Sequence, residues 1–249
     1  MITKISMINI TPISFQGHKP HKQYLTPLGQ DEFVRSNNST LDADGLINLD
    51  ISHFRFIDDN SVRGVTLANC KPEVLKEMKK FGINTVVDLR MPSKDMARYS
   101  AKCENSGIEY FHFPLKLNLP IFNMPFTTSC SNTEFLNDKK EFLQKLSKFF
   151  DISKKGNYYM ACELGLHRTD LAVTMNYLLN PQVPSKVPLL THNYDSSVKD
   201  FTNKYIAAIR NLFHNLSKKD LQTLGLPEDY RFIIAERITE LKKVNLKKL

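Results

Sequence analysis

The residues at positions 162–170, Cys-Glu-Leu-Gly-Leu-His-Arg-Thr-Asp, constrain the fold of this chain more than any other stretch. They follow a short apolar run at 158–161, which predicts a buried strand, and precede apolar residues at helical spacing over 169–179. A connection of this kind that carries Gly165 can curl so that successive backbone N–H groups point into one concavity. The N-terminus of the following helix adds its partial positive charge. The sequence therefore predicts an anion site in the 162–168 loop.

Three side chains suit this anion site to phosphate chemistry. The planar guanidinium of Arg168 can hold two oxygens of a tetrahedral dianion. The same positive field favours the thiolate form of Cys162, which is the nucleophilic form. Thr169 can donate its hydroxyl to the sulfur and make the thiolate a better leaving group when a phospho-cysteine is hydrolysed. The alternative interpretation is that Cys162 is a buried small apolar side chain, as most free cysteines are.

The residues before the loop predict a scaffold of alternating strands and helices. The β-branched run at 83–89 predicts a central parallel strand. Other strands are expected within 48–56 and at 62–65 and 108–113, and helices at 72–81, 93–105 and 133–150. This alternation predicts an α/β fold with a mostly parallel central sheet flanked by helices.

Three segments should meet where the parallel strands end, because ligands bind beyond the carboxyl ends of strands in such sheets. Cys162 follows one strand, Arg90 follows the strand at 83–89, and a proline-broken stretch over 114–132 follows the strand at 108–113. A long loop in this position is more often functional than accidental.

The chain divides into three parts by composition and periodicity. Residues 1–45 carry several prolines and no sustained period, which predicts a tail or arm. Residues 46–180 are expected to form the main domain, and residues 181–249 a C-terminal helical extension packed on it. Ser217 and Asp220 mark the expected start of one helix in that extension. Apolar residues at helical spacing predict packing of its last helix onto the domain: Ile233, Ile234, Ile238 and Leu241.

Composition narrows the classes of protein that need to be considered. No apolar run is long enough to span a bilayer, and residues 1–17 lack the pattern of a secretory signal. The four cysteines are scattered, which predicts a reducing, cytoplasmic location and neither a zinc site nor a disulfide framework: Cys70, Cys103, Cys130 and Cys162. The formal net charge of +8 is spread among acidic neighbours, so nucleic acid is not the expected partner. It suits an anionic substrate drawn in by long-range steering.

The loop resembles the Cys-x5-Arg-Ser/Thr signature of the protein tyrosine phosphatase superfamily in Cys162, Gly165, Arg168 and Thr169. Residues 54–90 also resemble the opening half of compact dual-specificity phosphatases, so the resemblance covers roughly residues 54–179. Three short elements are particularly similar to the plant and fungal atypical dual-specificity phosphatases: His167-Arg168-Thr169, Phe113-Pro114 and Asn118. Bacterial tyrosine phosphatases of the same build are also similar.

This resemblance implies a protein tyrosine phosphatase-like fold and a cysteine-dependent phosphatase that needs no metal or cofactor. Cys162, Arg168 and Thr169 would be its catalytic residues. The phosphate would be bound by the backbone N–H groups of six residues: Glu163, Leu164, Gly165, Leu166, His167 and Arg168. The expected substrates are phosphotyrosine and phosphoproteins. Because the atypical branch acts on inositol pyrophosphates, an inositol (pyro)phosphate phosphatase is the alternative.

Several positions depart from the family pattern. Ala161 stands where the family usually has histidine, and Asp170 where it usually has glycine. Leu166 replaces the lysine of the atypical branch, which weakens the case for a very highly phosphorylated substrate. Asp170 could tighten or oppose the binding of substrate charge, or favour the helix N-terminus.

The largest departure concerns the general acid. In the family an aspartate protonates the leaving oxygen, but the corresponding stretch here, residues 114–125, contains no carboxylate. The remaining candidates are Asp95, Glu134 and Asp138. Otherwise the enzyme is slow on phosphotyrosine, its leaving group is already good, or the chain is a phosphate-binding pseudophosphatase. A rhodanese-like sulfurtransferase is a third class, against which Thr169 after Arg168 speaks.

Overall fold

The structure is a computed structural model that describes residues 40–58, 60–115, 132–165, 167–180, 209 and 216–247. Within these residues, no helix combines the length and the apolar character needed to cross a membrane. The expected tail up to residue 39 lies outside the description, as do residues 116–131 of the proline-broken stretch and most of the helix expected near 197–216.

The described strands form one five-stranded sheet in the order β1-β2-β5-β3-β4. Their bounds are Arg55–Asp58 for β1, Ser61–Val65 for β2, Thr85–Asp88 for β3, Glu109–His112 for β4 and Tyr158–Cys162 for β5. β1 is antiparallel to β2, whereas the pairings β2 with β5, β5 with β3 and β3 with β4 are parallel. The predicted α/β fold with a mostly parallel sheet is therefore confirmed.

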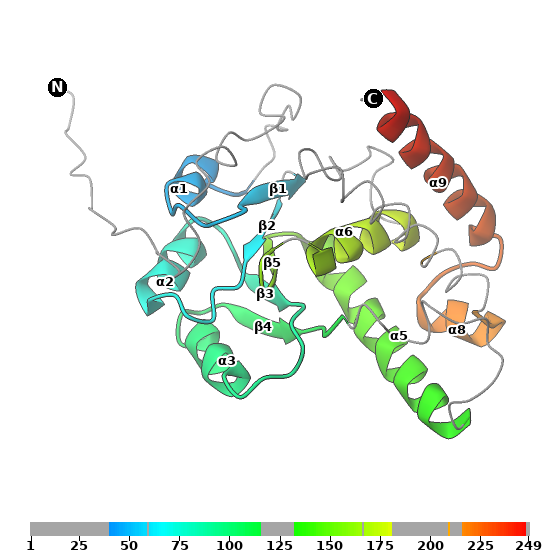
Figure 1. Cartoon of the computed structure of the whole chain (residues 1–249), viewed down its shortest axis with the longest axis horizontal. Coiled ribbons are helices and arrows are strands. Elements are labelled where there is room, and N and C mark those ends of the chain that lie inside the picture. The colour runs from blue at the N-terminus through cyan, green and yellow to red at the C-terminus, as the bar shows by residue number, and fades with distance from the viewer. Residues whose placement is uncertain are drawn as a thin grey trace.

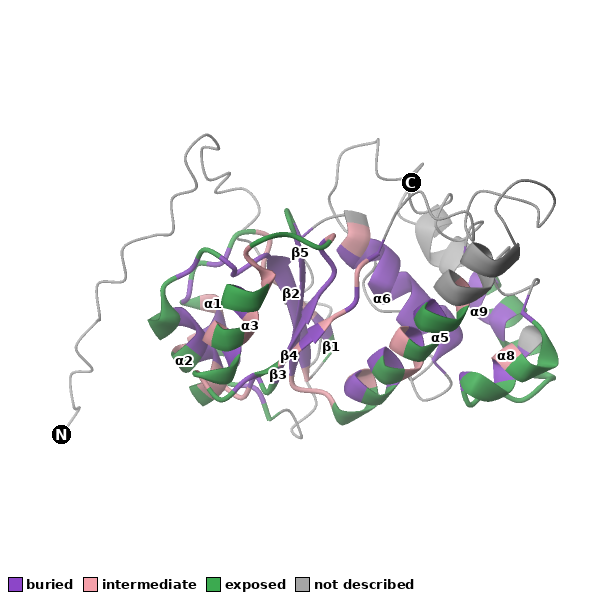
Figure 2. Cartoon of the chain, turned by 90° about the horizontal axis from the view of Figure 1, so that it is seen from below, coloured by how far each residue is buried: buried purple, intermediate pink, exposed green. Residues whose placement is uncertain are grey.

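Helices cover both faces of this sheet (Figures 1 and 2). One group lies on one face: α1 (Ala43–Ile47), α2 (Pro72–Lys80) and α3 (Met96–Glu104). The second group lies on the other face: α5 (Asn132–Lys155) and α6 (His167–Leu179), with α8 (Lys218–Thr223) and α9 (Tyr230–Lys247) beyond them. The described helices α8 and α9 fall within the expected C-terminal extension, and the division into three parts remains a prediction.

Two apolar cores, one on each face, hold the helices to the sheet. β5 contributes to both, because successive side chains of a strand point to opposite faces. Tyr158, Met160 and Cys162 belong to the core under α5 and α6, whereas Tyr159 and Ala161 belong to the core under α1, α2 and α3. The alternation places Cys162 on the face that α6 covers.

Helix ends follow the local signals in the sequence. Pro72 occupies the first turn of α2, and Gly82 follows its end with φ +101°, where a Cβ would lie 2.7 Å from the carbonyl oxygen of Thr40. Ser217 caps α8, and its side chain and that of Asp220 form a reciprocal capping box. Both predicted helix starts are confirmed.

One packing prediction is wrong at a single position. Ile234 and Ile238 of α9 are buried as expected, but Ile233 is 39% exposed. Adjacent helical residues point about 100° apart, so Ile233 and Ile234 cannot both face the same narrow contact. The side chain of Leu241 lies outside the description.

Candidate active site

Cys162 is the last residue of β5, and α6 begins five residues later at His167. The hydroxyl of Thr169, in the first turn of α6, donates a hydrogen bond to the sulfur of Cys162 over 3.2 Å. This is the contact that the spacing of the two residues predicts. Cys162 is 4% exposed and Thr169 is fully buried, so the hydrogen bond is shielded from water.

Gly165 brings the loop against the backbone of β2. Its φ is +68°, a conformation that glycine adopts without strain. A Cβ at this position would lie 2.4 Å from both the carbonyl carbon and the carbonyl oxygen of Gly64, and 2.7 Å from the nitrogen of Val65. Both the dihedral angle and the space therefore require glycine here.

Arg63 holds the loop from β2. Its Nη2 donates to the carbonyl oxygen of Gly165 over 3.0 Å, and its Nη1 forms an ion pair with the carboxylate of Asp170. Arg63 is 4% exposed and Asp170 is 1% exposed. Asp170 thus neutralises a buried arginine in the structure.

The sequence did not single out Arg63 as a site residue, although this charged side chain stands within the strand expected at 62–65. All five residues of β2 are buried, and one of them is this arginine. A buried charge requires a partner, because an isolated one is far more costly than a paired one.

Arg168 lies in the first turn of α6, where the helix N-terminus favours negative charge. Its Nε atom is buried and has no hydrogen-bond partner among the described residues. A buried unpaired donor costs free energy, which a bound anion at this place would offset. Of the other expected phosphate-binding residues, Leu166 lies outside the description and the side chain of His167 is not described.

A cleft of about 580 Å³ opens beside the loop, within the size range of small-ligand sites. It is lined by Asn69, Arg90, Met91, Pro92, Ser93, Asp95, Glu163 and Arg168. Arg90 therefore meets the 162–168 loop as expected. The stretch that follows β4 is described as far as Leu115, whose N–H donates to the carbonyl oxygen of Leu89 over 3.3 Å. Cys162 does not line the cleft, although Glu163 and Arg168 do.

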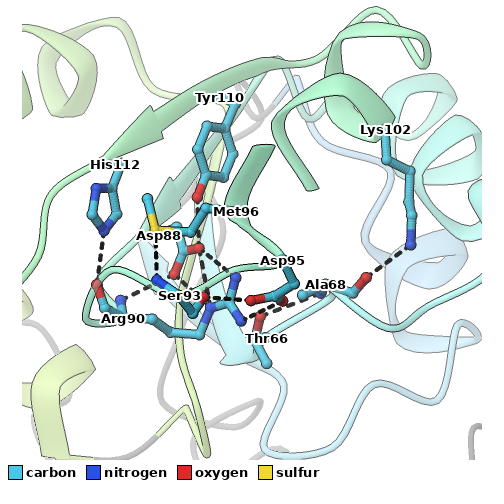
Figure 3. Close-up of polar contacts among 10 residues, drawn as sticks. All are labelled: Thr66, Ala68, Asp88, Arg90, Ser93, Asp95, Met96, Lys102, Tyr110 and His112. Atoms are coloured by element: carbon cyan, nitrogen blue, oxygen red, sulfur yellow. Dashed lines mark hydrogen bonds and ion pairs between the residues drawn. The ribbon is translucent and has the colours of Figure 1, made fainter. Parts of the chain in front are cut away.

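Carboxylates surround the guanidinium of Arg90 (Figure 3). Its Nε and Nη2 donate to the carboxylate of Asp88, with a shortest distance of 2.8 Å, and its Nη1 donates to Asp95 Oδ2 over 3.1 Å. The hydroxyl of Tyr110 also donates to Asp88, over 2.8 Å, and Ser93 donates to the other oxygen of Asp95. Asp88 is fully buried, so this network fixes one wall of the cleft.

Asp95 is the general-acid candidate that the cleft contains, but its environment favours the ionised form. The hydrogen bond from Ser93 and the hydrogen bond and charge of Arg90 lower the pKa of its carboxyl group. A general acid must carry a proton when the substrate is bound. The side chains of Glu134 and Asp138 are not described, and of the 114–125 stretch only Pro114 and Leu115 are.

Two other cysteines lie in the core under α1, α2 and α3. Burial raises the pKa of the Cys70 thiol to about 11 and that of the Cys103 thiol to about 12. Both remain thiols at neutral pH and are poor nucleophiles.

The described residues contain no group of three or more His, Cys, Asp and Glu side chains arranged to hold a metal ion. The sequence also predicts no cofactor, so no residue was expected to bind one.

No protein-family model matches the sequence, and no curated protein is similar to it. Solved structures are similar in fold. A candidate phosphatase (DUF442) from Shewanella putrefaciens CN-32 is 14% identical over 67% of this chain and 92% of its own, with a TM-score of 0.42. TpbA from P. aeruginosa is 14% identical over 71% and 86%, with a TM-score of 0.36. Kinase associated phosphatase (KAP) is 14% identical over 70% and 87%, with a TM-score of 0.30.

Proposed function

We propose that this chain is a metal-independent phosphatase that acts through a phospho-cysteine intermediate on phosphotyrosine and phosphoprotein substrates. The observation that carries the proposal is the 3.2 Å hydrogen bond from the Thr169 hydroxyl to the Cys162 sulfur. It joins a nucleophile at the end of β5 to a residue that can stabilise the same sulfur as a leaving group, at the N-terminus of α6.

In the first half-reaction, the thiolate of Cys162 attacks phosphorus, an S–P bond forms and the bond to the leaving oxygen breaks. The leaving oxygen takes up one proton from solvent water and departs as an alcohol or phenol. Arg168 and the N–H groups of the loop hold the other phosphate oxygens, so the charge of the transition state stays next to fixed donors. The buried Nε of Arg168, unpaired among the described residues, supports this role.

In the second half-reaction, water attacks phosphorus, the S–P bond breaks, and inorganic phosphate and the Cys162 thiolate are released. Thr169 donates its hydrogen bond to the sulfur as negative charge returns there, which lowers the barrier to this step. The sum of the two halves is hydrolysis of one phosphate ester.

The proton for the leaving oxygen distinguishes this proposal from a pseudophosphatase. Asp95, the general-acid candidate that lines the cleft, is held as a carboxylate. We expect faster turnover of p-nitrophenyl phosphate, whose leaving group is good, than of phosphotyrosine, because a phenol with a pKa of about 10 needs a proton donor more. A pseudophosphatase would release no burst of p-nitrophenol.

The test is hydrolysis of p-nitrophenyl phosphate by the purified chain in the presence of EDTA. Turnover should continue in EDTA, stop with orthovanadate and be lost in Cys162→Ser, which should still bind phosphate. Cys103→Ser is the matched control, because its thiol is buried away from the loop and should leave turnover intact. Turnover that survives Cys162→Ser would overturn the proposal.

We also propose a cytoplasmic location, since a nucleophilic thiolate at Cys162 works only where thiols stay reduced. Reversible loss of turnover in hydrogen peroxide, restored by dithiothreitol, would support a requirement for such a compartment.

A further inference from the structure

We infer that the cleft beside the loop selects singly phosphorylated substrates whose groups next to the phosphate ester are neutral or cationic. A phosphotyrosine flanked by lysine or arginine has this chemistry, whereas a polyphosphorylated inositol does not. The inference rests on the proposed function, because it concerns the same phosphate site.

Arg90 lies where a second phosphate could be bound, but its guanidinium donors are already bound to carboxylates. It lines the cleft together with Arg168 and Glu163 of the loop. Its Nε and Nη2 bind Asp88 and its Nη1 binds Asp95, so both edges of the guanidinium already face carboxylates (Figure 3). A second phosphate would have to displace one of two bound carboxylates and would meet the repulsion of the other.

The charges at the cleft favour the same conclusion. Of the residues that line the cleft, Arg90 and Arg168 are positive and Asp95 and Glu163 are negative, while the fully buried Asp88 pairs with Arg90. Arg168 and Glu163 have no ion-pair partner among the described residues, and Glu163 is exposed in the loop directly after Cys162. Once a phosphate dianion engages Arg168, the charged groups that remain among the described lining residues are Arg90, which is already paired with carboxylates, and the carboxylates of Asp95 and Glu163.

The other lining residues fit an uncharged body. Asn69, Met91, Pro92 and Ser93 carry no charge, and the cleft volume is enough for an aromatic ring. The ring would lie between this uncharged wall and Glu163, with its neighbours in the peptide near the two carboxylates.

The net charge of the whole chain acts in the opposite direction. The formal charge of +8 draws any anion toward the protein at long range. Contacts within the cleft discriminate at short range, where each like or unlike charge pair changes affinity by about five-fold to ten-fold. A preference for basic peptides would therefore report the cleft and not the overall charge.

The experiment measures binding of two fluorescent phosphotyrosine peptides to the full-length Cys162→Ser variant. The peptides are identical except for the residues on either side of the phosphotyrosine, which are lysine in one and glutamate in the other. We expect the lysine peptide to bind at least about ten-fold more tightly at low ionic strength, with the ratio falling as salt is added. myo-Inositol hexakisphosphate should displace the peptide no better than inorganic phosphate does.

Two variants test which carboxylates cause the tighter binding of the lysine peptide. Glu163→Lys, made in the same Cys162→Ser background, should bring the ratio to about one or reverse it, and Asp95→Asn should lower it. Glu236→Lys is the matched control: Glu236 is exposed on α9, a helix that contributes no residue to the lining of this cleft, and its substitution changes the net charge equally. The control should keep the ratio of the parent.

Each result bears on one claim. Equal binding of the two peptides, binding of neither, tighter binding of the glutamate peptide, or displacement by the hexakisphosphate more than about ten-fold better than by phosphate would each overturn the inference. Turnover of p-nitrophenyl phosphate by the unsubstituted chain is measured alongside. Its absence with the peptide preference intact would refute the proposed catalysis and leave the binding preference standing.

Discussion

Arg63 and Asp170 form a buried ion pair that ties β2 to the first turn of α6. The same guanidinium donates to the carbonyl oxygen of Gly165, so one side chain holds both the middle of the loop and the helix that follows it. The loop must keep its N–H groups aimed at one point to bind an anion, and this pair fixes it from behind.

Asp170→Asn should destabilise the protein severely. The substitution leaves the Arg63 charge buried without a counterion, which costs about 3–5 kcal/mol when one partner of a buried pair is removed. Thermal unfolding should show a fall in Tm of about 10 °C for a chain of this size. Asp229→Asn, at an exposed position, is the control and should change little.

A paired replacement separates charge from packing. Arg63→Met together with Asp170→Leu removes both charges and should recover much of the lost stability, because the cost lies in the uncompensated charge. A single Asp170→Asn variant within about 1 kcal/mol of the parent would show that the pair does not restrain the loop.

Gly165→Ala should disrupt the loop, and Gly225 offers a matched comparison. Both glycines have φ +68°, so alanine carries the same dihedral strain at each position. At Gly165 the added Cβ would lie 2.4 Å from the Gly64 backbone, whereas at Gly225 nothing lies within 4 Å. Gly225→Ala should cost about 1 kcal/mol. Gly165→Ala should cost clearly more in urea unfolding and should abolish phosphate binding; equal costs would contradict this contact.

The sequence predicts contacts that arise locally and misses those that depend on strand register. The hydrogen bond from Thr169 to Cys162 follows from seven residues of spacing across a strand-loop-helix. The contact of Arg63 with Asp170 spans more than a hundred residues and exists because β2 pairs with β5 so that Val65 lies opposite Cys162. No periodicity within either segment specifies that register.

The protonation state of Asp95 is a second property that the sequence does not predict. Asp95 is one of the three general-acid candidates that the sequence offers, and it does line the cleft. The hydrogen bonds that it accepts from Ser93 and Arg90 favour its ionised form. These hydrogen bonds depend on the rotamers of Arg90, Ser93 and Asp95. Sequence spacing places residues at a site but does not assign their charge states.

Thr169→Val should slow the second half-reaction more than the first. Valine has nearly the same shape but cannot donate to the Cys162 sulfur, and a hydrogen bond to a charged group is worth about 1.5–3 kcal/mol, or about 10-fold to 100-fold in rate. Rapid mixing with p-nitrophenyl phosphate should show a burst followed by slow steady turnover. Thr169→Ser keeps the hydroxyl and should turn over close to the parent; a Thr169→Val variant with unchanged kcat would remove the proposed role.

The pH dependence of turnover should not report Asp95. Its carboxyl pKa is lowered by Ser93 and Arg90, so it is ionised above its ordinary value of about 3.9 and cannot lose a proton near neutrality. The pH profile of kcat between about pH 5 and pH 8 should therefore keep its shape in Asp95→Asn, even if the maximal kcat changes. Loss of the alkaline limb in this variant would identify Asp95 as the general acid.

Asp220 gives a test of how the C-terminal extension is attached. Partial burial acts to raise the pKa of its carboxyl group, but the hydrogen bonds from Lys139 of α5 and Ser217 outweigh burial and lower it. Because the folded value lies below the unfolded one, the stabilisation is present above about pH 4 and is lost as the pH falls through the folded value.

Asp220→Asn should therefore lower the free energy of unfolding by about 1–2 kcal/mol at pH 7, through loss of the ion pair with Lys139 and weakening of the hydrogen bonds that the carboxylate accepts from Ser217. The difference from the parent should shrink as both are titrated below about pH 4, because the parent then also loses the carboxylate. Ser217→Ala is the matched control: it weakens the cap but keeps the ion pair of Asp220 with Lys139, so much of its pH dependence should remain. A difference that stays constant from neutral to acid pH would mean that the charge of Asp220 does not join α8 to α5, and that the extension is held by its apolar contacts alone.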